Sequence, residues 1–275
     1  MSKFDVRTLN SLREFQECER IQEEVWGAPG VTAEVVSVIA KYGGAVLGAF
    51  AGRKLAGFLF AFLARRRGRL IHWSHMMAVR GGFRDQGLGF KMKLAHRKLA
   101  LAQGITSICW TYDPLQSRNA ALNIVRLGAV VDEYSPDCYG RFSSLIERGL
   151  ESDRFVVNWK IASARVERRL REGPPSLDGS ALPRANETII NLYGLLVNRR
   201  IHLRLAARKL LVEIPSSTDT MRASDMKLAA RWRTETRRIF QLYFRDGYRV
   251  ADFVPPSEAT AGKCFYVLRR IGDGT

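Results

Sequence analysis

The sequence has few cysteines, and their spacing matches neither a metal site nor a disulfide framework. The four cysteines of this 275-residue chain lie far apart, with no CxxC pair and no Cys/His ligand spacing: Cys18, Cys109, Cys138 and Cys264. We therefore expect no zinc centre or other metal site, and free thiols as in a reducing cytoplasm.

The sequence also lacks a long apolar run. Residues 43–64 are largely apolar but are interrupted by Arg53 and Lys54, which favours two buried strands around a turn over a membrane span. Residues 1–15 contain charged residues and no apolar stretch typical of a signal peptide. We expect a soluble cytoplasmic protein that does not bind membranes.

Charge of one sign is not concentrated in a tail. The net charge is +17, shared almost evenly between residues 1–150 and 151–275, and the 46% hydrophobic content is ample for a buried core. A diffuse positive field attracts polyanions, among them nucleic acid and phosphorylated cofactors such as coenzyme A. Composition does not separate these two partners, and simple solubility is a third explanation.

Alternating and helical hydrophobic periods predict an α/β (α+β) protein. Strands and helices are expected in the first half at 9–25 (helix), 32–41 (helix), 45–51, 54–64, 70–79, a helix from about 87 to 103, 105–112, 117–127 (helix), 129–134 and 155–161. In the second half a strand at 209–214, a long helix at 221–245 and strands at 248–254 and 264–269 follow.

A segment rich in charge, proline, glycine and serine divides the chain. We predict a first domain at 1–163, a linker at 164–185 and a smaller C-terminal α/β domain at 186–275. The strand, helix, strand, strand order of the second domain repeats that of the first domain's second half, so a degenerate second copy is one interpretation of it.

The most informative segment joins a strand to a helix through Arg84-Asp85-Gln86-Gly87-Leu88-Gly89. Glycines let a backbone turn tightly and approach a ligand closely, and the N-terminus of a helix presents unpaired amides and positive potential to an anion. A diphosphate fits such a site. The loop is neither a G-x-G-x-x-G dinucleotide motif nor a Walker A motif, because the spacing differs and no Gly-Lys-Ser/Thr follows.

The pattern Val79-x-x-x-Phe83-Arg84-x-x-Gly87-x-Gly89 resembles the V-x-P-x-Y-R-G-x-G-x-G signature of the GCN5-related N-acetyltransferase (GNAT) superfamily. Two positions depart from it, since Gly81 replaces a frequent proline and Asp85 a frequent glycine. Downstream, Asn119-Ala120-Ala121 begins a helix that ends at Gly128, which is similar to the family's second motif. The resemblance covers about residues 5–162 and implies a GNAT fold, a mixed, mostly antiparallel sheet with flanking helices.

The resemblance also implies a binding site for acetyl-CoA or another acyl-CoA as co-substrate. The backbone of Met77 and Val79 would pair with the pantetheine arm, and Asn119 would contact the arm or fix the adjoining loop. The family's pyrophosphate site corresponds here to Arg84, Gln86, Gly87, Leu88, Gly89 and Phe90.

The catalytic residues are harder to assign. His75 resembles the catalytic histidine of arylalkylamine N-acetyltransferases, and strand alternation would place it on the same face as Met77 and Val79, with His72 on the other face. A hydrogen-bonded strand histidine is the alternative. Ile124 stands where the resemblance leads one to expect a tyrosine that acts as general acid. Tyr112 is the preferred substitute. The alternatives are Tyr134, Tyr139, or departure of the thiolate without a proton donor.

Two further groups of polar residues have competing interpretations. Asp113 and Arg118 could bind an ammonium or carboxylate of the acceptor, or could cap a helix and line a solvated turn. The arginines of the long helix spread around it, which favours a solvated face over a nucleic-acid stripe; they are Arg231, Arg233, Arg237 and Arg238.

The leading hypothesis is an acyl-CoA-dependent N-acyltransferase acting on the amine of a small molecule such as an amino acid, with acetyl, succinyl or another acyl group transferred. The second domain is expected to line the acceptor pocket or a homodimer interface. The alternative is a catalytically inactive GNAT-fold module that binds nucleic acid or senses coenzyme A. Nucleic acid is not favoured, because the Arg84–Gly89 loop is intact.

Overall fold

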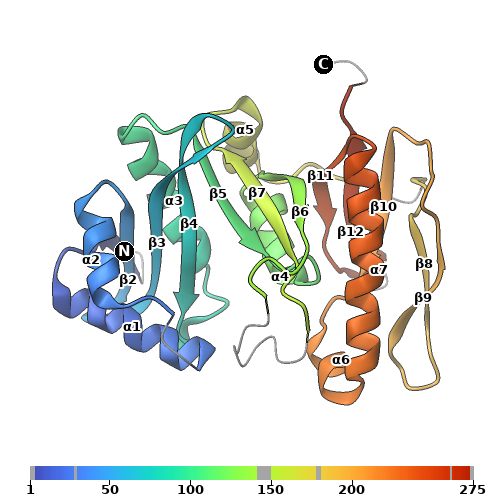
Figure 1. The fold of residues 1–275 in the computed structure, drawn as a ribbon, viewed down its shortest axis with the longest axis horizontal. Coiled ribbons are helices and arrows are strands. Elements are labelled where there is room, and N and C mark those ends of the chain that lie inside the picture. Colours follow the sequence, from blue (N-terminus) through green and yellow to red (C-terminus); the bar gives the residue numbers. More distant parts are fainter. Residues whose placement is uncertain (1–3, 28–29, 141–149, 178–180, 261, 273–275) are drawn as a thin grey trace. The chain divides into compact units, whose positions relative to one another are not determined.

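A computed structural model describes two compact units of the chain (Figure 1). The described residues are 4–27, 30–140, 150–177, 181–260 and 262–272. The first unit contains residues 4–110 and 160–163 of these, and the second contains 111–140, 150–159 and 164–272. The main division therefore falls near residue 110, whereas the sequence predicts a linker at 164–185.

The first unit is a sheet of five strands with three helices. Its strands follow the order β1-β2-β3-β4-β5, antiparallel from β1 to β4 and parallel between β4 and β5. In chain order the elements are β1 (Asp5–Thr8), α1 (Leu12–Trp26), α2 (Ala33–Lys41), β2 (Ala45–Ala51), β3 (Lys54–Arg66), β4 (Arg69–Val79), the 3-10 turn η1 (Gly81–Phe83), α3 (Leu88–Ala102) and β5 (Ser107–Tyr112).

Local sequence explains the bounds of α1. Ser11 accepts a hydrogen bond from the backbone N–H of Glu14, whose side chain in turn accepts one from the N–H of Ser11, forming a capping box. Gly27 ends the helix at a φ of 80°, a left-handed conformation that glycine adopts without strain.

The sheet of the first unit has a hydrophobic core on each face. One core lies beneath α1 and α2 and includes Phe15, Phe58 and Phe60. The other lies beneath α3 and includes Leu88 and Met92, with Met77 and Val79 packed against it. The two faces of β4 therefore meet different helices, which matters for every side chain on that strand.

The second unit combines an antiparallel sheet, a long helix and a hairpin. The sheet order is β7-β6-β11-β12-β10, and β8 and β9 form a separate two-stranded sheet. The elements are α4 (Ser117–Ala120), the π-helical turn η2 (Ala121–Arg126), β6 (Val130–Ser135), β7 (Arg154–Lys160), α5 (Ala164–Glu172), β8 (Asn186–Ile190), β9 (Leu196–Ile201), β10 (Lys209–Ile214), α6 (Asp219–Ser224), α7 (Met226–Arg245), β11 (Tyr248–Val254), the 3-10 turn η3 (Glu258–Thr260) and β12 (Cys264–Arg270).

Aromatic side chains fill the core of the second unit. Phe155 of β7 contacts five other rings at centroid distances between 4.7 and 5.8 Å, those of Tyr112, Tyr134, Phe240, Phe244 and Tyr266. The predicted buried stripe of the long helix is confirmed, because Trp232, Ile239 and Tyr243 are at most 1% exposed.

The α5 helix occupies the start of the segment predicted to be a linker. Its Arg169 is buried and donates from Nη1 to the carbonyl oxygens of Ile124 and Val125, at 2.8 and 2.7 Å. Nη2 of Arg169 donates to Asp252 of β11 at 3.0 Å. One side chain thus ties α5 to the π-helical turn and to the sheet of its own unit.

The predicted fold class, a mixed and mostly antiparallel sheet with flanking helices, is confirmed. The prediction missed β1, α5, β8 and β9. The helix predicted at 221–245 is two helices, because Asp225 breaks it and caps α7 by accepting from the N–H of Leu228. The order β10, α7, β11, β12 is as predicted, and the duplication of the first domain stays a prediction.

Candidate functional site

The edge of β4 that faces β5 is paired over only two residues. His72 pairs with Ile108 and Trp73 with Cys109, and the register goes no further although β4 continues to Val79. On its other edge, β4 pairs with β3 along its whole length. Among the described residues, the later part of β4 therefore presents extended backbone to which a ligand can add as a strand does.

This strand leads into a loop in which two residues adopt the left-handed backbone conformation. Asp85 has a φ of 60° and Gly87, the N-cap of α3, has a φ of 78°. Aspartate is among the few non-glycine residues that tolerate this conformation, which explains how it stands where the family signature has glycine. A Cβ built at Gly81, Gly82 or Gly87 would meet nothing within 4 Å, so the backbone here is open to a ligand.

No side chain in the first turn of α3 neutralises the positive potential at the N-terminus of this helix. No side chain caps it and no acidic residue lies in it. The first N–H groups of a helix have no intrahelical partners, so this terminus attracts an anion. Arg84 is exposed and donates from Nε to the carbonyl oxygen of Val79 at 3.1 Å, and Gln86 donates from Nε2 to the carbonyl of Gly82 at 3.2 Å. Both side chains brace the loop.

The predicted site residues fall in both units. Met77, Val79 and the Arg84–Phe90 segment belong to the first unit, as does His75. Tyr112, Asp113, Arg118 and Asn119 belong to the second. Leu88 is buried in the core beneath α3, so any contact it makes with a ligand must come from its backbone.

The predicted face of His75 is wrong, because β4 contains a bulge there. Phe60 pairs with Met76 and Ala61 with Ser74, which leaves His75 as an extra residue without a partner in β3. Its ring is 5.5 Å from that of Phe60, in the core beneath α1 and α2, whereas Met77 and Val79 pack beneath α3. His75 remains exposed, and partial desolvation lowers its pKa, which keeps the ring neutral near pH 7.

The same bulge reverses the prediction for His72. This residue lies on the α3 side of the sheet, where its Nδ1 is 2.9 Å from Nε2 of His96. Both imidazoles are completely buried, and burial lowers their pKa values below the ordinary range.

Next to this pair lies a buried lysine that the sequence analysis did not single out. Lys93 of α3 is 2% exposed and donates from Nζ to Oγ of Ser74 on β4 at 3.0 Å. Desolvation lowers the pKa of Lys93 to about 7. A signal was present, because Lys93 and His96 lie next to the apolar stripe that runs through Met92 and Leu99.

Tyr112, the preferred candidate acid, is engaged in the core of the second unit. Its hydroxyl donates to that of Tyr266 at 3.3 Å, and the Tyr266 hydroxyl donates to the carbonyl oxygen of Pro114 at 2.8 Å. Burial raises the pKa of Tyr112. These contacts are those of a packed core tyrosine and argue against proton donation to a substrate.

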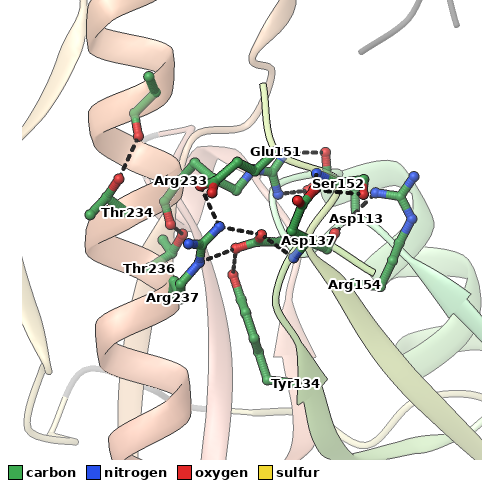
Figure 2. Close-up of polar contacts among 12 residues, drawn as sticks. Asp113, Tyr134, Asp137, Glu151, Ser152, Arg154, Arg233, Thr234, Thr236 and Arg237 are labelled. Atoms are coloured by element: carbon green, nitrogen blue, oxygen red, sulfur yellow. Dashed lines mark hydrogen bonds and ion pairs between the residues drawn. The ribbon is translucent and has the colours of Figure 1, made fainter. Parts of the chain in front are cut away.

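Asp113 is also committed to a partner within its unit. Arg233 of α7 donates from Nη1 and Nη2 to the two carboxylate oxygens of Asp113, at 2.5 and 2.7 Å, and both side chains are largely buried (Figure 2). Asp113 also accepts from the N–H of Leu115, as in an Asx turn. Arg118 and Asn119 are exposed. Asp113 thus lies in a turn, but it is largely buried against Arg233 rather than solvated.

The predicted solvated face of the long helix is wrong for two of its arginines. Arg233 is 3% exposed, and Arg237 donates to both carboxylate oxygens of buried Asp153 and to Glu151 (Figure 2). Tyr134 donates to the same Asp153 at 2.5 Å. Burial would raise the pKa of Asp153, but the hydrogen bonds from Arg237, a backbone N–H and Tyr134 outweigh it and leave that pKa lowered.

The described residues lack two further features, a metal-binding cluster and a membrane-spanning helix. They contain no group of three or more His, Cys, Asp or Glu placed to hold a metal ion. None of the helices in the described part of the chain combines the length and apolar character needed to cross a membrane.

Comparison with known proteins shows similarity at the level of structure. Neither a family model nor a curated protein matches the sequence. The NatC complex bound to Gag peptide and CoA contains a chain with 13% identity and a TM-score of 0.48, over 58% of this chain and 99% of that one. The ribosomal-protein-S18-alanine N-acetyltransferase of Escherichia coli has 14% identity and a TM-score of 0.47, over 58% and 96%.

A GNAT-family acetyltransferase of Streptococcus pneumoniae gives 16% identity and a TM-score of 0.46, over 56% of this chain and 97% of that one. All three proteins share at most 16% sequence identity with this chain. The known proteins to which this chain is similar in structure thus include acetyltransferases of the GNAT family.

Proposed function

We propose that this protein transfers an acyl group from acyl-CoA to the amine of a small molecule such as an amino acid. The proposal rests on three consecutive features of the first unit. They are an incompletely paired β4, an open loop with residues of positive φ, and a helix N-terminus with neither a side-chain cap nor an acidic residue in its first turn. Coenzyme A combines an extended amide-containing arm with a diphosphate, and these features are complementary to both parts.

Each part of the site would have a defined task. The amides from Gln86 to Phe90 would bind the diphosphate, with Arg84 adding positive charge. The backbone near Met77 and Val79 would hydrogen-bond the arm. The acyl group transferred would be acetyl, succinyl or another acyl group.

His75 is the proposed base for the acceptor amine. Its exposed ring lies at the bulge of β4, and its lowered pKa keeps the imidazole able to accept a proton at neutral pH. In the second unit, exposed Arg118 is the residue proposed to bind a carboxylate of the acceptor. Tyr112 keeps only a packing role in this proposal.

The binding step can be tested by calorimetric titration with acetyl-CoA and succinyl-CoA. A Gly87→Trp variant should lose binding, because a large side chain would cover the helix terminus. Gly52→Trp is the matched control: Gly52 also has a positive φ, 57°, and open space around it, but lies in the β2–β3 turn. Binding by the native protein and by the control, but not by the Gly87 variant, supports the site.

The same titration can overturn the proposal. If the native protein binds neither ligand at about 1 mM, the binding free energy is weaker than about 4 kcal/mol and the site is not one for coenzyme A. Once binding is established, release of the free thiol in the presence of candidate amines tests transfer. Binding without transfer to any amine would instead support a coenzyme A sensor.

A further inference from the structure

The amine of Lys93 lies at the point where β4 and β5 stop pairing. The last paired residues are Trp73 and Cys109, and the next residue on each strand is a contact of this amine. Nζ of Lys93 donates to Oγ of Ser74 at 3.0 Å and lies 3.6 Å from the ring centroid of Trp110. One side chain from α3 therefore reaches both strands at the inner end of the open β4 edge.

This position is costly for a lysine. Lys93 forms no ion pair among the described residues, since desolvation is the cause of its pKa shift and no carboxylate contributes. Burying an amine without a counter-ion carries a large desolvation penalty. The ring of Trp110 offsets part of it through a cation–π contact. An apolar side chain of similar length would fill the space without that penalty, so packing alone does not explain a lysine here.

Two neutral histidines, His72 and His96, lie close to Lys93. His96 lies on the same helix and its pKa is lowered by burial and by the charge of Lys93, while His72 approaches from β4 and bonds His96. Among the described residues, Nδ1 of His96 has no hydrogen-bond partner. Because the imidazoles stay neutral, the proton of the cluster belongs to Lys93, and its pKa of about 7 populates both forms near neutral pH.

We propose that Lys93, acting through the hydroxyl of Ser74, donates the proton to the thiolate that leaves acyl-CoA; this inference rests on the proposed function. During transfer the acceptor nitrogen bonds to the acyl carbon, the carbon–sulfur bond breaks and its electron pair leaves with sulfur. Ser74 gives its hydroxyl proton to sulfur and receives one from the ammonium of Lys93. The acceptor nitrogen gives its proton to His75, which releases it to solvent, and Lys93 takes up one proton from solvent after product release.

The assignment supplies a proton donor at a site where the two positions considered first supply none. Ile124 has no proton to give at the position where the resemblance leads one to expect a tyrosine. The hydroxyl of Tyr112 is held by Tyr266. In contrast, the hydroxyl of Ser74 accepts from Lys93, which leaves its own proton free for donation.

The experiment measures the ionisation of bound coenzyme A and needs no acceptor. The ultraviolet absorbance of the thiolate is followed against pH for coenzyme A bound to native protein, Lys93→Met and Ser74→Ala, with desulfo-coenzyme A as the blank. Lys98→Met is the matched control, because Lys98 is exposed on the same helix. We expect the bound thiol to ionise at least about one pH unit lower in the native protein and the Lys98 variant than in Lys93→Met.

Ser74→Ala is expected to shift the bound thiol pKa toward that of Lys93→Met, and a value equal to the native one would overturn the part assigned to Ser74. If Lys93→Met binds coenzyme A as the native protein does and its bound thiol ionises at the same pH, the role of Lys93 is overturned while the proposed function stands. If the native protein binds no coenzyme A, the proposed function itself fails, and the inference with it.

Discussion

The buried amine of Lys93 should make the stability of this protein rise with pH. Burial lowers the pKa of Lys93 to about 7 in the folded state, whereas a lysine in an unfolded chain has a pKa of about 10.4. Between these values the unfolded chain holds the proton and the folded protein does not. Because the unfolded state then binds more protons, the free energy of unfolding increases as pH rises from 7 toward 10.

The size of the effect follows from the two pKa values. Where the unfolded chain holds the proton and the folded protein does not, the free energy of unfolding rises by about 1.4 kcal/mol for each pH unit. Just above pH 7 the rise is smaller, because part of the folded protein still carries the proton there. From pH 7 to pH 9 the native protein should therefore gain about 2 kcal/mol relative to a variant that lacks the amine. Lys93→Met is that variant, since methionine keeps the length of the side chain without the charge.

Urea unfolding at pH 7, 8 and 9 measures this difference, with equal slopes against urea as the check that the same surface is exposed in each protein. Titrating groups that do not interact with Lys93 cancel when Lys93→Met is subtracted from the native protein, and His96, whose pKa is lowered well below 6.5, stays neutral over this range. Lys98→Met should keep the native pH dependence, because its lysine is exposed. A constant difference between native protein and Lys93→Met across this range would refute the reasoning.

Three further predictions concern stability, each measured by urea unfolding. Asp113→Ala should cost about 3–5 kcal/mol because it leaves buried Arg233 unpaired, whereas Asp113→Leu combined with Arg233→Met should cost less than Asp113→Ala alone. Asp153→Asn should destabilise at pH 7, and because the native pKa of Asp153 is lowered, the difference from native should shrink as pH falls below about 3.9. Gly57→Ala should cost about 1–3 kcal/mol, because its Cβ would lie 2.6 Å from the carbonyl oxygen of Ala78.

The sequence predicted the elements that carry strong local signals. The helix α1 has its capping box and C-terminal glycine, and β2 and β3 have unbroken apolar runs around a turn. The loop before α3 was recognisable because its glycines and the flanking strand and helix are all local features. By contrast, α5 was hidden by its many charged residues, and its buried Arg169 has partners 44 or more residues away.

The side-chain environments of the site could not be predicted to the same extent. The face of His75 depends on a bulge that exists only in the pairing of β4 with β3, so alternation along one strand gives the wrong answer. Arg233 was assigned to solvent because its partner, Asp113, lies 120 residues earlier in the chain. Lys93 was overlooked because a lysine on a helix is usually exposed, and only the fold places Ser74 and Trp110 against it.

The contacts of Arg169 bear on how the protein can be dissected. A chain cut after residue 163, at the predicted domain boundary, would lose α5 and with it the donor to the carbonyl oxygens of Ile124 and Val125. Those two carbonyl oxygens would lose this hydrogen-bond donor, and Asp252 would belong to a separate polypeptide. The shorter fragment is thus a poor reagent for binding studies, and work on coenzyme A should use the whole polypeptide.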